Sequence, residues 1–296
     1  MRTLLLLLTL VASTALSAQV GLPFTQQAAR ECNARQLDAA LKTMEVAMAS
    51  GEDTHAFAWY VLGFVHKELY VNRDNSSMRS PHRAQAEEAI LHSMDLDPAG
   101  EYTENNRNAL RFLAISHYND ALQLTKTFMG ANAELPKGEW ERFESLMVHV
   151  EPDYDFGANA ADFFKHMGRG YNRIYLEGGG KDRFLLDYSS RYYKRALDYD
   201  ADDYKTNYNL AINYYNLGVK RIKQIDHNTD IFELLRIQDE CVVLFQLALP
   251  YMEKAHAQDP ERVETLKGMM AIHRALSNRA ISDQFRTQLR DILGEE

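Results

Sequence analysis

Apolar residues recur every three or four positions along almost the whole chain, and no segment alternates apolar and polar residues with a period of two. Residues 26–49 are typical, because their apolar side chains fall on one face of a helix. This spacing predicts a nearly all-helical protein. Clusters of Gly, Pro, Asn and Asp predict breaks between helices at 50–51, 75–81, 98–100, 130–138, 152–157, 178–180, 226–230 and 259–260.

The helical segments form pairs in which small residues recur at fixed places. First helices are predicted around Trp59, Leu62, Gly63 and His66, around Leu110, Leu113, Ala114 and His117, around Phe164, Met167, Gly168 and Tyr171, around Asn207, Leu210, Ala211 and Tyr214, and around Leu266, Met269, Met270 and His273. Second helices are predicted around Ala86, Ile90 and Ser93, around Ser189, Tyr193 and Ala196, and around Ala248, Met252 and Ala255. A Gly or Ala at a crossing lets two helix backbones approach closely while larger residues fill the groove beside it.

These motifs resemble the tetratricopeptide repeat (TPR) family, most clearly in residues 205–218 (KTNYNLAINYYNLG) and 248–261 (ALPYMEKAHAQDPE). The resemblance begins at about residue 36, and the order of elements is similar to that of exported bacterial TPR proteins. It implies an all-α fold, a right-handed α-solenoid of TPR-like helix hairpins, formed by a single domain over residues 19–296. We place the repeat-like pairs at residues 27–70, 81–126, 138–176, 183–226 and 230–293.

One insertion sets the C-terminal repeats apart from the template. Between Tyr214 and Ala248 the chain is far longer than a TPR turn and keeps helical periodicity on both sides of Asp226 to Asp230. Split over two helices, the extra residues add roughly 18 Å to each. We therefore expect an extended helical hairpin near the C-terminus, which either stabilises the neighbouring repeats or serves as a docking arm for a partner.

The N-terminus has the three parts of a secretory signal peptide. A charged start at Arg2 precedes the apolar run 4–12 and the small residues that end at Ala18. The apolar run is shorter than the ~20 residues that span a bilayer. We expect residues 1–18 to be removed and the mature protein to be periplasmic or secreted. No cysteine follows the cut, so a lipid anchor at that position is not expected.

Charge and cysteine content narrow the classes further. The net charge of −9 disfavours nucleic-acid binding, because no global positive field exists. Export permits a disulfide between Cys32 and Cys241, the two cysteines of the chain. In an extended stack these residues belong to distant layers and exceed the ~4.4–6.8 Å Cα separation of a disulfide. We expect two free, buried thiols.

The chain shows no motif that would support catalysis or a cofactor. Its histidines lack the spacing of metal ligands, and three of them, His66, His117 and His273, occupy the aromatic position of the repeat, where packing is expected. Four aspartates between 198 and 203 suggest a calcium loop, but Asp203 stands where the loop needs Gly. The glycines at 178–180 predict a flexible loop. We therefore predict no catalytic residue, no metal and no cofactor.

The resemblance implies a binding groove on the concave side of the solenoid, lined by inward positions of the first helices. The groove residues carried over from the family are Arg111, Tyr118, Lys165, Arg169, Arg173, Lys205, Tyr208, Asn209, Ile212 and Tyr215. Cations are frequent in this set although the protein is acidic. A positive groove favours an acidic or C-terminal peptide segment.

We therefore expect a non-enzymatic, monomeric scaffold that binds a protein or peptide through this groove, with no nucleic acid and no membrane span. An alternative rests on the eight tyrosines between Tyr188 and Tyr215. A partly exposed row of these rings with flanking carboxylates would indicate an envelope protein, or an enzyme, that contacts a glycan or small ligand. Flanking Lys, Arg and Asn would indicate a peptide.

Overall fold

The computed structural model describes residues 21–98, 100–129 and 132–294, so the predicted signal peptide, residues 1–18, lies outside the described residues. It confirms the all-α prediction: the described ranges contain α-helices, one short 3-10 helix and turns, and no strand. None of the helices in these ranges combines the length and the apolar character that a membrane crossing requires.

The chain predicted to form one domain packs as two compact units, which we call unit 1 and unit 2. Unit 1 is the chain up to Asp120 together with Glu139–Tyr154, and unit 2 is Ala121–Gly138 together with the chain from Asp155 onwards. Unit 1 contains α1 (Pro23–Asn33), α2 (Leu37–Ala49), η1 (Glu52–Thr54), α3 (Ala56–Asn72), α4 (Pro81–Leu96) and most of α5 (Thr103–Thr125) and α6 (Glu134–Val150). Unit 2 contains α7 (Gly157–Glu177), α8 (Arg183–Tyr199), α9 (Tyr204–Ile222), α10 (Ile231–Gln258), α11 (Val263–Ala275) and α12 (Arg279–Leu293).

In unit 1 the helices α3 and α4 form a close hairpin at Gly63. A Cβ atom on Gly63 would lie 2.7 Å from Cγ1 of Ile90 and 3.2 Å from its backbone nitrogen. The hydroxyl of Ser93 donates to the carbonyl oxygen of Ala56 at 2.9 Å and ties the other end of the pair. The small residue of the repeat motif therefore faces the second helix, as the sequence predicts.

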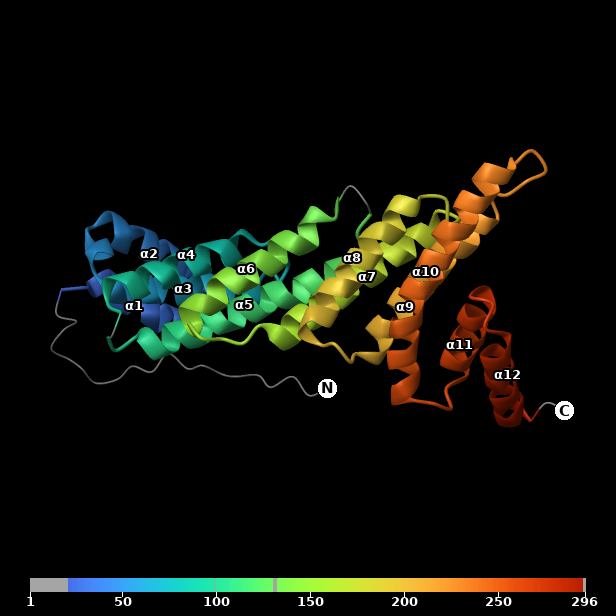
Figure 1. Cartoon of the computed structure of the whole chain (residues 1–296). Helices are drawn as coiled ribbons and strands as arrows, with labels where there is room; N and C mark the ends of the chain where they lie inside the picture. The colour runs from blue at the N-terminus through green and yellow to red at the C-terminus, as the bar shows by residue number, and fades with distance from the viewer. Residues whose placement is uncertain (1–20, 99, 130–131, 295–296) are drawn as a thin grey trace. The chain divides into compact units, whose positions relative to one another are not determined.

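Unit 2 repeats this arrangement in two further hairpins, in which the helices lie side by side (Figure 1). A Cβ on Gly168 of α7 would lie 2.6 Å from Cδ1 of Tyr193 on α8. One on Gly218 of α9 would lie 2.6 Å from Cε1 of Phe245 on α10. Both crossings depend on the missing side chain, because each ring occupies the space that a methyl group would need.

The observed hairpins are offset by one helix from the ranges that we predicted for the repeat-like pairs. The closest packing joins α3 to α4, α7 to α8 and α9 to α10, whereas the predicted ranges 81–126 and 183–226 join α4 to α5 and α8 to α9. The motifs themselves match the observed pairs. The ranges differ because a second helix also packs on the next first helix, and length alone does not separate the two kinds of neighbour.

Two predicted helix boundaries are wrong. Residues 26–49 form two helices, because the chain turns at 34–36 with Arg35 at φ 60°. The predicted break at 130–138 is shorter than expected, since α6 begins at Glu134 and includes Gly138. Short polar turns without Pro or Gly leave little signal in the sequence, and a Gly inside a helix is tolerated at a cost of about 1 kcal/mol.

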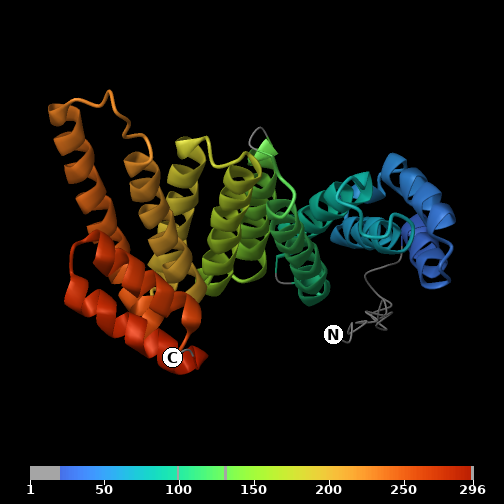
Figure 2. The ribbon, with the colours of Figure 1, turned by 90° about the vertical axis from the view of Figure 1, so that its right-hand side faces the viewer.

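The extended hairpin predicted near the C-terminus is formed by α9 and α10. The longer helix, α10, has 28 residues and is about 42 Å long. Its N-terminus is capped by Asp230, whose carboxylate accepts hydrogen bonds from the backbone N–H groups of Phe232 and Glu233 at 2.9 Å. α10 extends beyond α11 and α12, which lie against its C-terminal half (Figure 2).

Candidate functional site

The predicted groove residues are divided between the two units. Arg111 and Tyr118, on α5, belong to unit 1, and the other eight belong to α7 and α9 in unit 2. Within unit 2 these two helices are linked by a hydrogen bond from Nδ2 of Asn172 to Oδ1 of Asn213 at 2.9 Å. The inward positions of α7 and α9 are therefore neighbours within this unit.

Three of the five groove cations have acidic partners within the protein. Lys165 lies 3.4 Å from both Asp162 and Asp203. Arg173 bonds Glu177 at 2.8 Å, and the guanidinium of Arg111 lies 3.8 Å from Glu151. The charge available to a ligand is therefore smaller than the sequence suggests.

The other two cations, Arg169 and Lys205, are exposed, and in the described ranges neither has an acidic side chain at ion-pair distance. Tyr208, Ile212 and Tyr215 are half-buried and pack against the core of unit 2. Among the predicted groove cations, Arg169 and Lys205 are thus the ones that remain available to a ligand. The apolar groove residues are partly used in packing.

Asp203 belongs to the acidic run that resembles a calcium loop, and the structure gives it another role. Its carboxylate accepts a hydrogen bond from the backbone N–H of Thr206 at 2.7 Å and caps the N-terminus of α9. Burial raises the pKa of Asp203, but the bonds from Thr206 and the charge of Lys165 outweigh this effect and lower it. The carboxylate of Asp203 therefore bonds the first turn of α9, the helix that follows it.

Two tyrosines of the predicted tyrosine-rich region, Tyr188 and Tyr192 of α8, stack on Tyr171 of α7, which precedes that region. The ring centroids of these two pairs are 5.2 and 5.5 Å apart. The guanidinium of Arg195 lies 3.9 Å from the ring centroid of Phe164, and that of Arg191 lies 5.5 Å from that of Tyr188. The charged groups that lie over these rings are thus guanidinium cations, and the rings stack on one another.

A notch lies in unit 2 between the extended hairpin and the end of α11. We call it the hairpin notch. It has a volume of about 620 Å³, within the usual range of ligand pockets. Its walls are Ile222 and Ile225 after α9, one face of α10 from Leu234 to Leu249, and the turn 275–278.

The face of α10 that lines the hairpin notch is a helical stripe. Leu234, Gln238, Cys241, Phe245 and Leu249 follow one another at spacings of three and four residues. No charged side chain lines the notch. Cys241 and Phe245 are also buried against α9, whereas Leu234 is 36% exposed. The notch is therefore an uncharged surface of mixed apolar and amide character that is open to solvent.

The charges of this hairpin lie on another face of α10 and neutralise one another. Glu240 is bonded by Arg221 of α9 at 2.7 Å and also by Arg236. Arg236 bonds Glu233 at 2.6 Å. An anionic or cationic ligand finds no unpaired charge among these four side chains.

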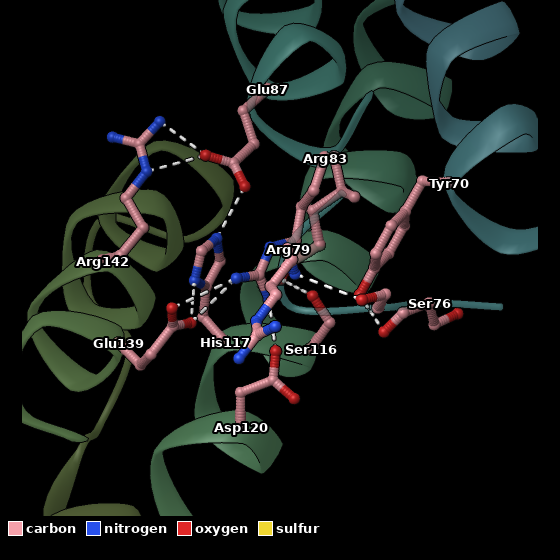
Figure 3. Close-up of polar contacts among 12 residues, drawn as sticks. Tyr70, Ser76, Arg79, Arg83, Glu87, Ser116, His117, Asp120, Glu139 and Arg142 are labelled. Atoms are coloured by element: carbon pink, nitrogen blue, oxygen red, sulfur yellow. Dashed lines mark hydrogen bonds and ion pairs between the residues drawn. The ribbon is translucent and has the colours of Figure 1, made fainter. Parts of the chain in front are cut away.

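Unit 1 contains a buried network of ionisable side chains that joins three helices (Figure 3). Arg83 of α4 bonds Asp120 of α5 at 2.5 Å and Glu139 of α6 at 3.0 Å. His117 of α5 lies 2.6 Å from both Glu139 and Glu87. Arg142 of α6 completes the network at 2.6 Å from Glu87, so three carboxylates meet three basic groups.

The network favours the charged forms of His117, Glu87 and Glu139, whereas burial raises the pKa of Asp120. Burial disfavours the imidazolium of His117, but hydrogen bonds to Glu139 and Glu87 outweigh it and raise its pKa above the ordinary value. Burial also disfavours the carboxylate of Glu87, yet His117 and Arg142 lower its pKa. These ion pairs join α4, α5 and α6 within unit 1.

His66 and His82 form a second polar contact in unit 1, with their Nδ1 atoms 2.9 Å apart. Burial, with the nearby His82 and Arg73, lowers the pKa of His66 to about 4. Across the described ranges no group of three or more His, Cys, Asp or Glu side chains has the arrangement of a metal site. Both cysteines are free and buried.

Sequence reasoning missed the hairpin notch as a site and the ion network as a unit. The apolar residues of α10 were visible, but Gln238, Leu249 and the turn 275–278 join them only through the position of α11. His117 was expected to pack as an aromatic side chain, whereas it makes two ion-paired contacts. An excess of apolar positions on α10 over what a single partner helix covers is the signal that points to the notch.

No family model and no curated protein sequence matches the chain. Two solved structures align with most of it. The Pseudomonas aeruginosa protein PilF has 10% identity and a TM-score of 0.32, with 93% of this chain and 92% of that chain covered. PilW, described as a widely conserved type IV pilus biogenesis factor, has 16% identity and a TM-score of 0.32, with 94% and 96% covered. At these TM-scores neither alignment adds to what the helix packing shows.

Proposed function

We propose that this chain is a non-enzymatic scaffold of TPR-like hairpins that binds a protein or peptide in the periplasm or outside the cell. The observation that carries the proposal is the hairpin notch, an open volume of about 620 Å³ whose uncharged lining combines aliphatic side chains with the amides of Gln238 and Gln246. Solvated apolar surface of this kind is a common feature of protein-binding sites. The ionisable side chains of the buried network are paired with one another, which supports binding rather than catalysis.

The concave groove is the second docking surface of this proposal. Arg169 and Lys205 are its exposed cations without acidic partners in the described ranges. They would contribute charge-assisted hydrogen bonds to an acidic segment, and Tyr208 would contribute apolar contact. Lys165 is a weaker contributor because Asp162 and Asp203 already neutralise it.

Affinity capture of the mature chain from an envelope extract, followed by mass spectrometry, tests the function. We expect a protein that is retained by the wild type and absent from a resin that carries the heat-denatured chain. The Arg169→Ala, Lys205→Ala double variant then measures the contribution of the groove, which we expect to reach tenfold for an acidic partner, or about 1.4 kcal/mol. Hydrolysis or transfer by the purified chain on a captured molecule would contradict the scaffold assignment.

A further inference from the structure

The groove between α9 and α10 is already used by a helix of the same chain along part of its length. α11 packs against both α9 and α10, and a Cβ on its Gly268 would lie 2.5 Å from Cε of Met252 on α10. α11 has 13 residues and is about 20 Å long, whereas α10 is about 42 Å long. The helix that fills this groove therefore ends near the middle of α10, at the turn that closes the hairpin notch.

Beyond that turn the groove continues without a helix in it. The part of α10 that lines the notch, from Leu234 to Leu249, is about 24 Å long, or roughly four helical turns, and Leu276 of the turn packs on its buried residues Ile237, Cys241 and Phe245. Ile222 and Ile225 provide the opposite wall. A short helix would therefore lie here in continuation of the seat that α11 occupies.

The side chains of the notch suit a helix with an apolar stripe. Leu234, Val242 and Leu249 present aliphatic surface, and the amides of Gln238 and Gln246 supply hydrogen bonds at the edge. The lining holds no charge that would select an acidic or basic segment. α10 is helical along the whole notch, so the wall offers no sheet edge to an extended strand.

We propose that the hairpin notch binds an amphipathic α-helix of another protein, which lies along α10 beyond α11 and buries an uncharged apolar stripe of about three turns. This assignment rests on the proposed scaffold function and names its partner by class. The ligand differs from the acidic segment expected in the concave groove, because the groove offers cations and the notch offers none.

Photo-cross-linking at two matched leucines tests the proposal. Leu234 lines the notch, whereas Leu247 lies two residues from both Phe245 and Leu249 and therefore on the opposite face of α10. The two side chains are 36% and 43% exposed, so neither replacement disturbs the core. p-Benzoylphenylalanine is placed at each position in the full chain, the producing cells are irradiated, and the adducts are mapped by mass spectrometry.

We expect an adduct with another protein at position 234 in at least tenfold higher yield than at position 247. The attached peptide should carry apolar residues at positions i, i+3 or i+4, and i+7. Equal yields at the two positions, an adduct between two copies of this chain, a lipid adduct, or an attached peptide without this period would overturn the proposal.

The affinity capture described above shows whether the notch assignment alone is wrong or whether the scaffold function is wrong as well. The Leu234→Asp variant should lose the captured partner at least tenfold, and Leu247→Asp should retain it, with melting temperatures of both checked against wild type. If Leu234→Asp retains a partner that Arg169→Ala, Lys205→Ala loses, the scaffold function stands and the notch assignment is wrong. If the wild type captures no protein, both are wrong.

Discussion

The helices of unit 1 and those of unit 2 are joined by different kinds of contact. In unit 1, α4 is tied to α5 and α6 by a buried network of Arg83, Glu87, His117, Glu139 and their partners. In unit 2, a ring or thioether fills the space opposite a glycine at the close crossings, and the buried polar contacts between helices are neutral, such as the hydrogen bond from Asn213 to Ser189 at 2.9 Å. Directional polar contacts fix which helices meet but leave stability dependent on every partner and on pH, whereas apolar crossings depend mainly on volume.

The largest expected effect comes from removing one charge of the unit 1 network. Glu87→Gln leaves Arg142 and a protonated His117 without their carboxylate, at a residue that is 2% exposed. Breaking such a buried pair costs about 3–5 kcal/mol of unfolding free energy. Urea unfolding monitored by circular dichroism measures the loss.

The neighbouring exposed carboxylate gives the control for this variant. Glu88→Gln should change stability by less than about 0.5 kcal/mol. If the two variants unfold at the same urea concentration, the network does not stabilise unit 1 and the contrast between the units fails.

Volume should decide stability in unit 2, and two glycines test this with opposite signs. Gly168→Ala places a methyl group 2.6 Å from the buried ring of Tyr193 and should destabilise by about 1–3 kcal/mol. Gly138→Ala, inside α6 with no atom within 4 Å, should stabilise by up to about 1 kcal/mol. Thermal melting of both variants measures the signs, and two shifts in the same direction would show that the crossing at Gly168 is not close.

Two histidines of unit 1 should have opposite effects on the pH dependence, and His256 and His273 of unit 2, whose pKa values are lowered by burial, should add to the loss of stability below pH 6.5. The folded pKa of His117 is raised, so its contribution is complete below about pH 6.5 and is lost as the pH rises through the folded value. The folded pKa of His66 is lowered to about 4, so its unfolded form binds the extra proton and stability falls as the pH drops from 6.5 towards 4. Wild-type stability should therefore be greatest near pH 6.5.

Two variants test separately the loss of stability above pH 6.5 and the loss below it. His117→Gln should flatten the loss above pH 6.5, and His66→Gln should flatten the loss below it, as measured by the urea midpoint between pH 4 and 9. A profile of His117→Gln that still falls above pH 6.5 with the wild-type slope would place the titrating group elsewhere.

The smallest effect, and the one that reports on each unit separately, is thiol labelling. Each unit carries one buried cysteine, Cys32 in unit 1 and Cys241 in unit 2. Burial raises the pKa of Cys32 to about 11 and also raises that of Cys241, so both should react slowly with iodoacetamide in the native protein.

Mass spectrometry of the labelled peptides then connects the thiols to the variants. Glu87→Gln should accelerate labelling of Cys32 severalfold and leave Cys241 unchanged, and Gly168→Ala should do the reverse. Equal acceleration of both thiols in both variants would mean that the units open together. Two thiols titrated after denaturation without reductant would confirm that no disulfide forms in solution.

The sequence by itself determined the helical character of the chain and the small residues at the helix crossings, but not the bounds of the helix pairs. The three-to-four-residue spacing of apolar side chains predicts the all-α fold, and Gly63, Gly168 and Ala211 mark first helices that the structure places in hairpins. These features are local, because a helix and its crossing point are specified by residues within one or two turns. The extended hairpin was also visible, since the insertion after Tyr214 kept its helical period.

The tertiary structure alone decided which polar groups are free and where a ligand surface is open. Arg83, Asp120 and Glu139 are dispersed in the sequence and become partners only because α4, α5 and α6 converge. The sequence predicts Lys165 as a groove cation, but in the structure Asp203 lies 3.4 Å from it and pairs with its charge. The hairpin notch exists because α11 is shorter than the helix it covers. Ion pairing and exposure depend on distances between residues far apart in the chain, which the pattern along one helix does not specify.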